Sequence, residues 1–324
     1  MSNLHPIITR RFALAALGAA AALPYWPMFD ATAAPLHYPI EPQKIADGVW
    51  VIFGANEPIN MENGGAIANI AILDSSEGSI IIDTGPSLRF GSSLKSTAEQ
   101  LTGKSVARVL ITHFHPDHVF GNQAFEPSAL SAPQGVVDGL SRAGEDFASA
   151  MYHLTGDWMR GTELTLPTKI IDTGHEEIGE RRLHYIVLGG HTDTDLMIFE
   201  ERSGILFGGD LVFLDRAPTT PHADLQVWRN SLERLEEIRS DRIVPGHGPV
   251  EHGTRSITQT RDWLNTIEEV VRSAFDKGLS ITEAFSEPLP DWAERIALAR
   301  YEFERTVMHL YPKLEASVWP RVDR

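Results

Sequence analysis

The sequence predicts an α/β fold followed by a helical C-terminal extension. Short apolar runs of strand length recur from Val49 to Val244, and turn residues separate them. Stretches with apolar residues at helical spacing lie between these runs. After Pro249 the strand pattern ends, and only helical patterns follow. With 324 residues, of which 42% are hydrophobic, the chain can bury a sizeable core in one large domain or two ordinary ones.

The N-terminal segment has the layout of a secretory signal. Arg10 and Arg11 precede the apolar stretch from Phe12 to Leu23, and Ala31-Thr32-Ala33 suits a signal peptidase. The apolar stretch is shorter than the roughly 20 residues that span a bilayer. The arginine pair resembles a twin-arginine signal, although Phe12 follows it directly. We expect residues 1–33 to direct export to the periplasm; a Sec signal and an uncleaved membrane anchor are the alternatives.

Composition excludes several classes of function. The net charge is −16 without a basic stripe, which argues against nucleic-acid partners and against attachment to anionic membranes after signal cleavage. The sequence contains no cysteine, which excludes disulfides, thiolate-ligated metals and cysteine nucleophiles. Histidine and aspartate must therefore carry any transition-metal chemistry.

The first part of the chain is predicted as strands with one helix. The expected strands are residues 49–53, 66–73, 79–82 and 106–112. Apolar residues at helical spacing predict a helix over residues 87–101, which gives a β-α-β step. Residues 56–65 are rich in Asn, Gly and Pro and form a loop, either a flap over a site or a plain connection.

The second part alternates helices and strands before it becomes helical. Helices are expected at residues 133–160, 224–239 and 254–276, and strands at residues 169–172, 183–188, 195–200, 204–207 and 242–244. Ser280 and Glu283 form a capping box that opens a shorter helix. Asp291 is expected to cap a last helix that runs towards His309.

The segment from His113 to His118 places four candidate metal ligands in six residues. It follows an apolar strand, and Pro116 should end that strand because proline cannot donate a ladder hydrogen bond. His113 and His115 lie two residues apart, so their side chains point the same way in extended backbone. Two imidazoles that converge from one side are suited to zinc or a similar cation.

Three more candidate ligands follow an apolar strand and a glycine. They are His191, Asp210 and His247. Parallel strands gather their carboxyl ends at one edge of a sheet, and glycine lets the backbone approach a site closely. The sequence therefore predicts one metal site assembled from four strand ends.

These motifs resemble the metallo-β-lactamase superfamily. H-x-H-x-D-H, G-H-T, G-G-D and P-G-H-G occur in that order between residues 40 and 255. The resemblance implies an αββα sandwich over residues 36–253, a helical extension over residues 254–324, and a dinuclear centre at one edge of the two sheets. It implies a first metal on His113, His115 and His191, a second on Asp117, His118 and His247, and Asp210 as the bridge. Asp83 would brace the histidine loop, or serve as a plain turn residue.

Details of the ligand set discriminate between branches of the superfamily. The absence of cysteine excludes the lactamase subclass with a cysteine ligand. Asp210 fills the bridging position, as in glyoxalase II-like hydrolases and lactonases, and His115 stands where the oxygen-reducing di-iron branch has glutamate. The signal, the extension and the start Ala46-Asp47-Gly48-Val49-Trp50 resemble the quinoprotein relay system zinc metallohydrolases, periplasmic proteins associated with PQQ-dependent dehydrogenases.

The resemblance implies a hydrolase with two zinc ions, although nitrogen and oxygen ligands also suit iron or manganese. Water activated between the ions would attack a small ester, thioester or lactone-like substrate. Asp117 would orient the nucleophile or shuttle its proton, and His222, in a proline-rich loop, is a candidate substrate contact. The alternatives are a β-lactam hydrolase and a non-catalytic metal-binding accessory protein of a quinoprotein dehydrogenase system.

Overall fold

The computed structural model describes residues 36–318. Of these, residues 37–318 belong to one compact unit. The predicted signal over residues 1–33 lies outside the described residues. Within residues 36–318, none of the helices combines the length and the apolarity that a bilayer crossing requires.

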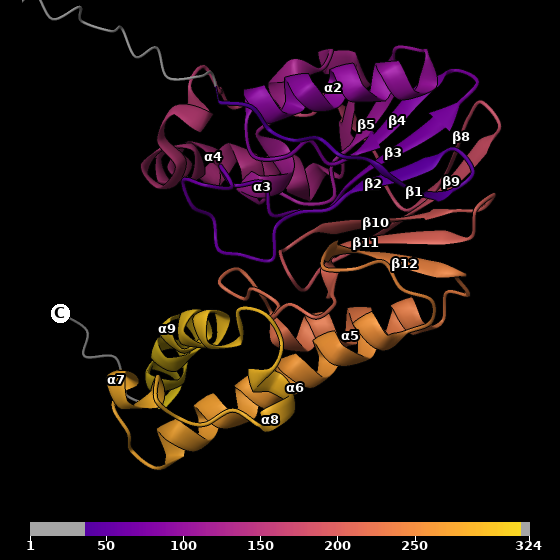
Figure 1. The fold of residues 1–324 in the computed structure, drawn as a ribbon. Helices are drawn as coiled ribbons and strands as arrows, with labels where there is room; N and C mark the ends of the chain where they lie inside the picture. Colours follow the sequence, from indigo (N-terminus) through magenta and orange to yellow (C-terminus); the bar gives the residue numbers. More distant parts are fainter. Residues whose placement is uncertain (1–35, 319–324) are drawn as a thin grey trace, which may run out of the picture. The chain divides into compact units, whose positions relative to one another are not determined.

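Two sheets face each other at the centre of this unit (Figure 1). The first has the order β1-β2-β3-β4-β5-β6-β7 and the second has the order β12-β11-β10-β9-β8. The strands of the first sheet are β1 (Gln43–Ala46), β2 (Val49–Ile52), β3 (Ile70–Ser75), β4 (Gly78–Ile82), β5 (Val106–Leu110), β6 (Leu130–Ala132) and β7 (Lys169–Ile170). Those of the second are β8 (Gly174–Ile178), β9 (Arg181–Leu188), β10 (Asp195–Glu200), β11 (Ile205–Phe213) and β12 (Arg242–His247).

Helices cover the outer faces of both sheets. In Figure 1, α2 lies over the first sheet with α4 beside it, and α5 and α6 lie along the second. The helices are α2 (Leu88–Thr102), α3 (Pro116–Val119), α4 (Gln134–Thr155), α5 (Leu225–Glu236), α6 (Arg255–Asp276), α7 (Ile281–Ala284), α8 (Asp291–Glu294) and α9 (Ala299–Val318). Short 3₁₀ turns lie at Asn122–Ala124, Pro127–Ala129 and Gly156–Met159. This arrangement confirms the predicted αββα sandwich with C-terminal helices.

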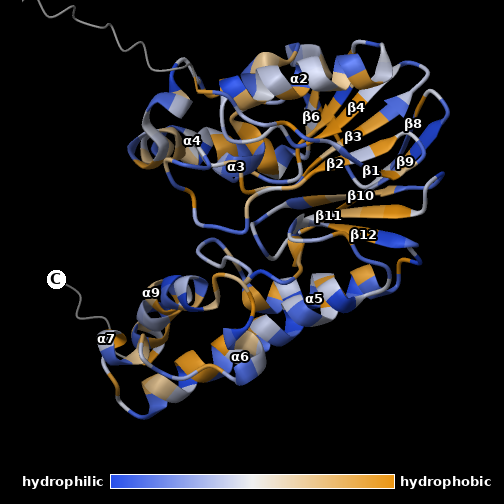
Figure 2. Cartoon of the chain, in the orientation of Figure 1, coloured by the Kyte–Doolittle hydropathy of each residue, from blue (hydrophilic) through white to orange (hydrophobic). Residues whose placement is uncertain are grey.

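Apolar side chains from both sheets form the core between them. Val51, Ile80 and Leu110 of the first sheet belong to one buried cluster with Ile198 and Phe207 of the second. Burying one such side chain stabilises the fold by about 1.5–3 kcal/mol. Figure 2 shows the resulting pattern, with hydrophobic strands inside and helices whose outer faces are hydrophilic.

The C-terminal helices extend the hydrophobic core of the second sheet. Trp263 and Ile267 from the apolar stripe of α6 are fully buried, and they share one cluster with Trp228 of α5, Phe213 of β11 and Phe303 of α9. The stripe predicted for residues 254–276 therefore packs as expected from its spacing.

The last predicted helix differs from the structure. Residues from Asp291 onward form two helices, because Leu298 adopts a left-handed φ of 62° and interrupts the helical path before α9. Ala297 instead accepts a hydrogen bond from the N–H of Ala217 at 2.9 Å. Asp291 is the first residue of α8, and its N-cap is Pro290.

Strand directions explain how distant residues reach one edge. β10 is antiparallel to both β9 and β11, and β12 is parallel to β11. β9, β11 and β12 therefore run in the same direction. In the first sheet β4 and β5 are parallel, so the residues that follow them also emerge together.

Candidate metal centre

The structure brings all seven predicted ligands together at one edge of the sandwich. The loop between β5 and the end of α3 carries His113, His115, Asp117 and His118, whereas His191 follows β9, Asp210 lies in β11 and His247 ends β12. All seven side chains are buried. They form two groups in which the ligand atoms lie within 4.8 Å of one another: His113, His115, His191 and Asp210, and Asp117, His118 and His247.

The carboxylate of Asp210 contacts both groups. Its Oδ2 lies 3.3 Å from Nε2 of His191 and 3.7 Å from Nε2 of His113. The same oxygen is 3.2 Å from Nε2 of His247, and Oδ1 is 3.3 Å from Nε2 of His118. Asp210 thus lies where a bridging ligand between two ions would lie. It was expected just after a strand end, but β11 continues through it to Phe213.

The remaining ligands complete each group. Oδ2 of Asp117 is 3.4 Å from Nε2 of His247 and 3.6 Å from Nε2 of His118. Nδ1 of His115 lies 2.8 Å from Nε2 of His191. His115 therefore presents its Nδ1 to this group, whereas its Nε2 points away.

Three buried polar atoms of the centre indicate that a cation fits between these ligands. Nε2 of His113, Nε2 of His118 and Oδ1 of Asp210 have no hydrogen-bond partner among the described residues. Leaving such an atom unsatisfied costs about 1–3 kcal/mol. Metal ions bound to the two groups would satisfy all three atoms, and the histidine and aspartate donors suit zinc, iron or manganese.

Partners behind the ligands set their orientation. Asp83 accepts hydrogen bonds from the N–H and the hydroxyl of Thr112, both at 2.8 Å, and contacts Nδ1 of His118 at 2.7 Å. Nδ1 of His247 lies 2.7 Å from the carbonyl oxygen of Ile67. These contacts direct Nε2 of His118 and of His247 towards Asp210. Asp83 therefore lies where the sequence analysis expected a brace.

Burial and charge set the protonation of the histidines. Burial lowers the pKa of His113, His115 and His191 well below the ordinary value, and neighbouring imidazoles lower it further. These three rings are neutral at pH 7, the form that binds metals. Burial also acts to lower the pKa of His118, but Asp210, Asp117 and Asp83 together raise it well above the ordinary value. The carboxylates thus favour positive charge at the centre.

The loop that carries His191 contains a buried carboxyl group. Asp195 accepts hydrogen bonds from the N–H and the hydroxyl of Thr192, both at 3.0 Å. Burial raises the pKa of Asp195 to about 8. Thr194 donates its N–H to the hydroxyl of Thr192 at 3.3 Å.

A pocket of about 250 Å³ opens onto the centre. Its lining includes His115, Asp117, Asp210, His247 and the predicted substrate contact His222. Nδ1 of His222 lies 2.9 Å from Nε2 of His115, the nitrogen that points away from the ligand group. Ile59 of the loop over residues 56–65 also lines the pocket, so this loop borders the site.

Sequence reasoning missed three charged residues of the pocket. Arg216 lies in the segment after β11, and Glu302 and Arg305 come from α9. The C-terminal helices therefore contribute to the site itself. Arg216 lies six residues after Asp210, the only signal in the sequence that could have pointed to it.

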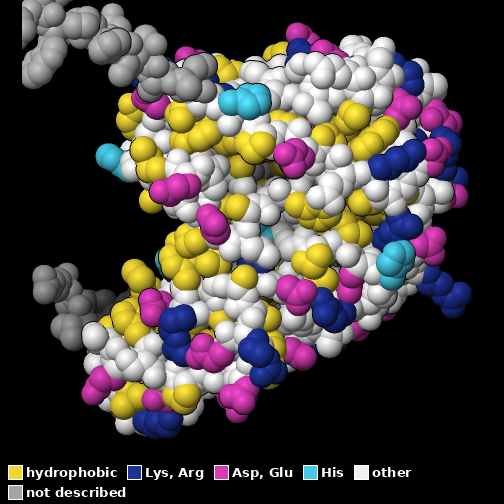
Figure 3. Space-filling model, viewed as in Figure 1, with side chains coloured by type: hydrophobic (Ala, Val, Ile, Leu, Met, Phe, Trp, Pro, Cys, Tyr) yellow, Lys and Arg dark blue, Asp and Glu magenta, His cyan; other side chains and the backbone are white. Residues whose placement is uncertain are grey.

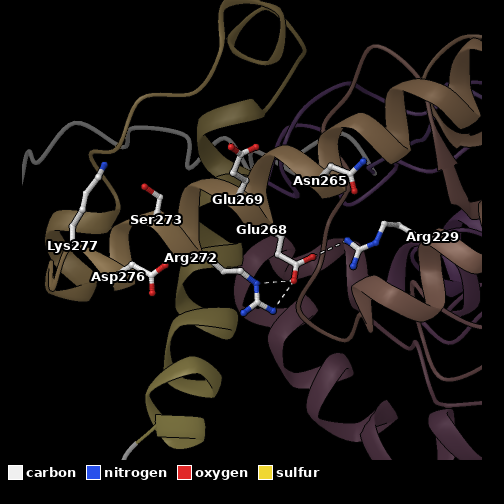
Figure 4. Close-up of a pocket in the computed structure, with 8 residues that line it drawn as sticks. All are labelled: Arg229, Asn265, Glu268, Glu269, Arg272, Ser273, Asp276 and Lys277. Atoms are coloured by element: carbon white, nitrogen blue, oxygen red, sulfur yellow. Dashed lines mark hydrogen bonds and ion pairs between the residues drawn. The ribbon is translucent and has the colours of Figure 1, made fainter.

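A second hollow, of about 710 Å³, lies on α6 beside α5 (Figure 4). Its lining is charged, and Glu268 pairs with Arg229 and Arg272, each at 2.7 Å. None of the candidate ligands lines it. This hollow has the character of a solvated, ion-paired helix surface.

Comparison with known proteins identifies the family. The family model described as the metallo-beta-lactamase superfamily matches residues 63–247. The chain belongs to the metallo-β-lactamase superfamily. The matched residues contain all seven candidate ligands together with Asp83 and His222.

Curated relatives of this superfamily member include named hydrolases. A beta-lactamase-like protein 2 homolog from Caenorhabditis elegans is 26% identical over 216 residues, which are 65% of each chain. A linear primary-alkylsulfatase from a Pseudomonas strain is 21% identical, over 65% of this chain and 48% of its own. An acyl-coenzyme A thioesterase from Homo sapiens is 24% identical, over 56% and 72%. The chain spans between about half and two thirds of the length of the first two.

Solved structures show the same fold. A metallo-beta-lactamase from Pontibacter korlensis superposes with a TM-score of 0.57 at 22% identity and covers 69% of this chain and 98% of its own. A metallo-beta-lactamase from Hirschia baltica gives a TM-score of 0.55 at 20% identity, with coverage of 70% and 98%. These similarities support the fold.

Proposed function

We propose that this protein is a hydrolase with two zinc ions, one on His113, His115 and His191 and the other on Asp117, His118 and His247. The observation that carries the proposal is the position of Asp210, whose carboxylate lies within 3.7 Å of imidazole nitrogens of both groups. A single carboxylate that contacts both groups is suited to hold two cations close together.

The residues of the chain have distinct roles in this proposal. Bound zinc would polarise the substrate and lower the pKa of water to roughly 7. Asp117 lies on the pocket wall and can accept the proton of the attacking water and return it to the leaving group. Asp83 holds His118 through the 2.7 Å contact, so that the ring presents Nε2 to the centre. The apolar part of the lining, from Ile59, Ile67 and α4, excludes bulk water.

We propose a small ester, thioester or lactone-like substrate. The filled bridging position, Asp210, is the support, because it matches the ligand set of glyoxalase II-like hydrolases. Among relatives, the names thioesterase and alkylsulfatase describe cleavage of thioesters and sulfate esters. The pocket volume of about 250 Å³ suits a small reacting group.

A panel of ester, thioester, lactone and β-lactam substrates tests this function on the zinc-loaded protein. We expect hydrolysis of an ester-type substrate by the wild-type protein and loss of most turnover in Asp210→Ala. Turnover of β-lactams alone would instead assign a β-lactamase. Inactivity across the panel, with zinc bound, would contradict the hydrolase and favour the non-catalytic accessory protein.

We further propose that the protein is exported to the periplasm and serves a quinoprotein dehydrogenase system. Support comes from the sequence: Arg10 and Arg11 before an apolar stretch, and the start Ala46-Asp47-Gly48-Val49-Trp50. Replacing both arginines by lysine should leave the precursor in the cytoplasm. Unchanged export in that variant would contradict the twin-arginine route. Deleting the gene of this protein tests its association with the dehydrogenase system. We expect quinoprotein-dependent oxidation to slow in the deletion strain, and an unchanged rate would contradict the association.

A further inference from the structure

Helix α9 gives the pocket a charged wall. Nη1 of Arg305 lies 3.1 and 3.0 Å from the two carboxylate oxygens of Glu302 and 2.9 Å from the hydroxyl of Thr219. Glu302 is only 1% exposed, whereas the side chain of Arg305 is 38% exposed and lines the pocket. Arg305 therefore spans from a buried carboxylate to the space in front of the centre.

Arg216 adds a second cation to this wall. It is 4% exposed, and its Nε has no hydrogen-bond partner among the described residues. Burial lowers the pKa of Arg216, and Glu302 is the carboxylate that most opposes this effect. Arginine nevertheless stays charged at neutral pH. The wall thus holds two guanidinium groups and one carboxylate.

This count leaves one positive charge without a carboxylate partner. Asp117 and Asp210 also line the pocket, but the proposed function assigns both to the metal ions. A buried cation is costly unless it is paired and hydrogen-bonded. An anionic group on a bound molecule would supply the missing partner, because carboxylate and sulfate groups match the donor geometry of arginine.

The other part of the lining is apolar. Phe147, Ala150, Met151 and Leu154 of α4 recur at helical spacing, and all four line the pocket. Leu154 is 47% exposed, so this stripe does more than fill the core. Figure 3 shows hydrophobic side chains gathered on both sides of the notch between the α4 side and the α9 side of the molecule. The volume of about 250 Å³ is below the roughly 300 Å³ typical of pockets for drug-sized ligands, which favours a short chain.

We infer that the substrates are amphipathic anions, with a short apolar chain against α4 and a carboxylate or sulfate group at Arg305 and Arg216. The inference rests on the proposed function, because the bond to be cleaved must lie at the ligands between these two walls. For an ester, hydrolysis breaks the acyl C–O bond, joins the oxygen of water to the acyl carbon and returns a proton to the leaving alcohol.

Binding of non-reactive probes tests the wall without turnover. Isothermal titration of the zinc-loaded protein would use hexanoate, hexanesulfonate and the neutral 1-hexanol. We expect the anions to bind more tightly than hexanol, and we expect Arg305→Gln to weaken the anions about tenfold, the loss typical of one charge-assisted hydrogen bond. Arg272→Gln, which removes an arginine from the remote α6 surface of Figure 4, is the matched control and should change nothing. Preference for hexanol would overturn the inference, and a difference between the two anions would identify the headgroup.

Glu302→Gln and Arg305→Gln should change anion affinity in opposite directions. Glu302→Gln raises the net charge of the wall, so anion affinity should increase, whereas Arg305→Gln lowers the charge and the affinity. Either variant breaks the contact between Glu302 and Arg305. If that contact had a purely structural role, the anion affinities of both variants would therefore change in the same direction. Arg305→Lys should restore part of the affinity. Zinc content, measured alongside, shows whether each variant keeps the centre.

Matched substrates separate this inference from the proposed function. Mono-4-nitrophenyl adipate and 4-nitrophenyl hexanoate have acyl chains of equal length, and only the first carries a carboxylate. We expect a lower KM for the adipate ester than for the hexanoate ester, and we expect Arg305→Gln to abolish this difference. Equal KM values with retained hydrolysis would overturn the substrate class and leave the hydrolase intact. If neither ester is hydrolysed with zinc bound, the ester hydrolase fails, and the titrations still decide on the anion wall.

Discussion

Asp83 orients residues of the centre although it is not one of the candidate ligands. It receives both donors of Thr112 and contacts His118, and it does so from a left-handed backbone with φ of 62°. Histidine ligands depend on such partners because the second ring nitrogen fixes the tautomer and the direction of the first. At the scale of the residue, the geometry of the centre therefore depends on Asp83 and Thr112 as well as on the candidate ligands.

Asp83→Asn should weaken zinc binding by about 10–100-fold. Asparagine tolerates the left-handed backbone, so the fold should remain while the contact with Nδ1 of His118 is lost. Competition with a chromogenic chelator measures the affinity. Asp74→Asn, which affects an ion pair of Asp74 with Lys104 on the surface, is the control. Equal affinities for wild type and Asp83→Asn would refute the bracing role.

Asp195 makes the stability of the metal-stripped protein depend on pH. Its pKa is about 8 in the folded protein against an ordinary value of 3.8, so the folded state holds a proton that the unfolded state releases between these values. Stability should therefore fall as pH rises from about 4 to about 8 and level off above. Urea unfolding with chelator should show this fall in the wild type, by up to about 1.4 kcal/mol per pH unit relative to Asp195→Asn. Parallel curves for the two proteins would be inconsistent with a protonated Asp195.

The sequence could predict the seven candidate ligands but not the charged wall. Four ligands are adjacent, and each of the others follows a glycine after a strand, so local patterns carry the information. Glu302 and Arg305 reach the pocket only because α9 packs against α6. The contact between Arg305 and Thr219 joins residues that lie 86 positions apart in the chain. No spacing rule connects such residues.

At the scale of the element, β11 shows why the sequence pattern predicted the wrong C-terminal end for this strand. Gly208-Gly209 reads as the end of a strand, but Gly209 adopts a φ of +50°, the register against β12 shifts there, and the strand resumes to Phe213. This irregularity turns Asp210 towards the histidines. The short strands β1, β6 and β8 were not predicted either, because three to five residues with mixed polarity carry little periodic signal.

Gly246→Ala should displace the carboxylate of Asp210 from its position between the two ligand groups. A Cβ at Gly246 of β12 would lie 1.9 Å from Oδ1 of Asp210 and 2.8 Å from the carbonyl carbon of Gly209, so the carboxylate must move. We expect zinc content to fall below one ion per chain, with secondary structure retained by circular dichroism. Gly174→Ala in β8, where a Cβ meets nothing within 4 Å, is the control. Full zinc content in Gly246→Ala would show that Asp210 is not held by this contact.

At the scale of the whole molecule, one buried ion pair joins the two sheets. Arg181 of β9 lies 3.1 Å from Glu200, and both side chains are almost fully buried. Arg181 also donates to the carbonyl oxygen of Gly48, at 2.9 Å, in the turn between β1 and β2, and to that of Asp74 in β3. The pair thus belongs to the second sheet while its hydrogen bonds reach the first.

Arg181→Met should lower the free energy of unfolding by about 3–5 kcal/mol, because it leaves Glu200 buried without its cation. Arg181→Met with Glu200→Gln should recover part of that loss. Arg202→Met, which removes surface pairs with Asp47 and Glu180, should cost less than about 1 kcal/mol. Urea unfolding measures the free energy of unfolding of all three variants. A loss for Arg181→Met no larger than that for Arg202→Met would contradict a stabilising role of the buried ion pair.

The central claim is a dinuclear centre bridged by Asp210, and zinc stoichiometry tests it most directly. The measurement is zinc per chain, by inductively coupled plasma mass spectrometry, after saturation and removal of free metal. The bridged centre predicts two ions in the wild-type protein and one or none in Asp210→Ala, because the variant loses the carboxylate shared by both groups. Two ions retained in Asp210→Ala, or a wild-type protein that binds none, would contradict it.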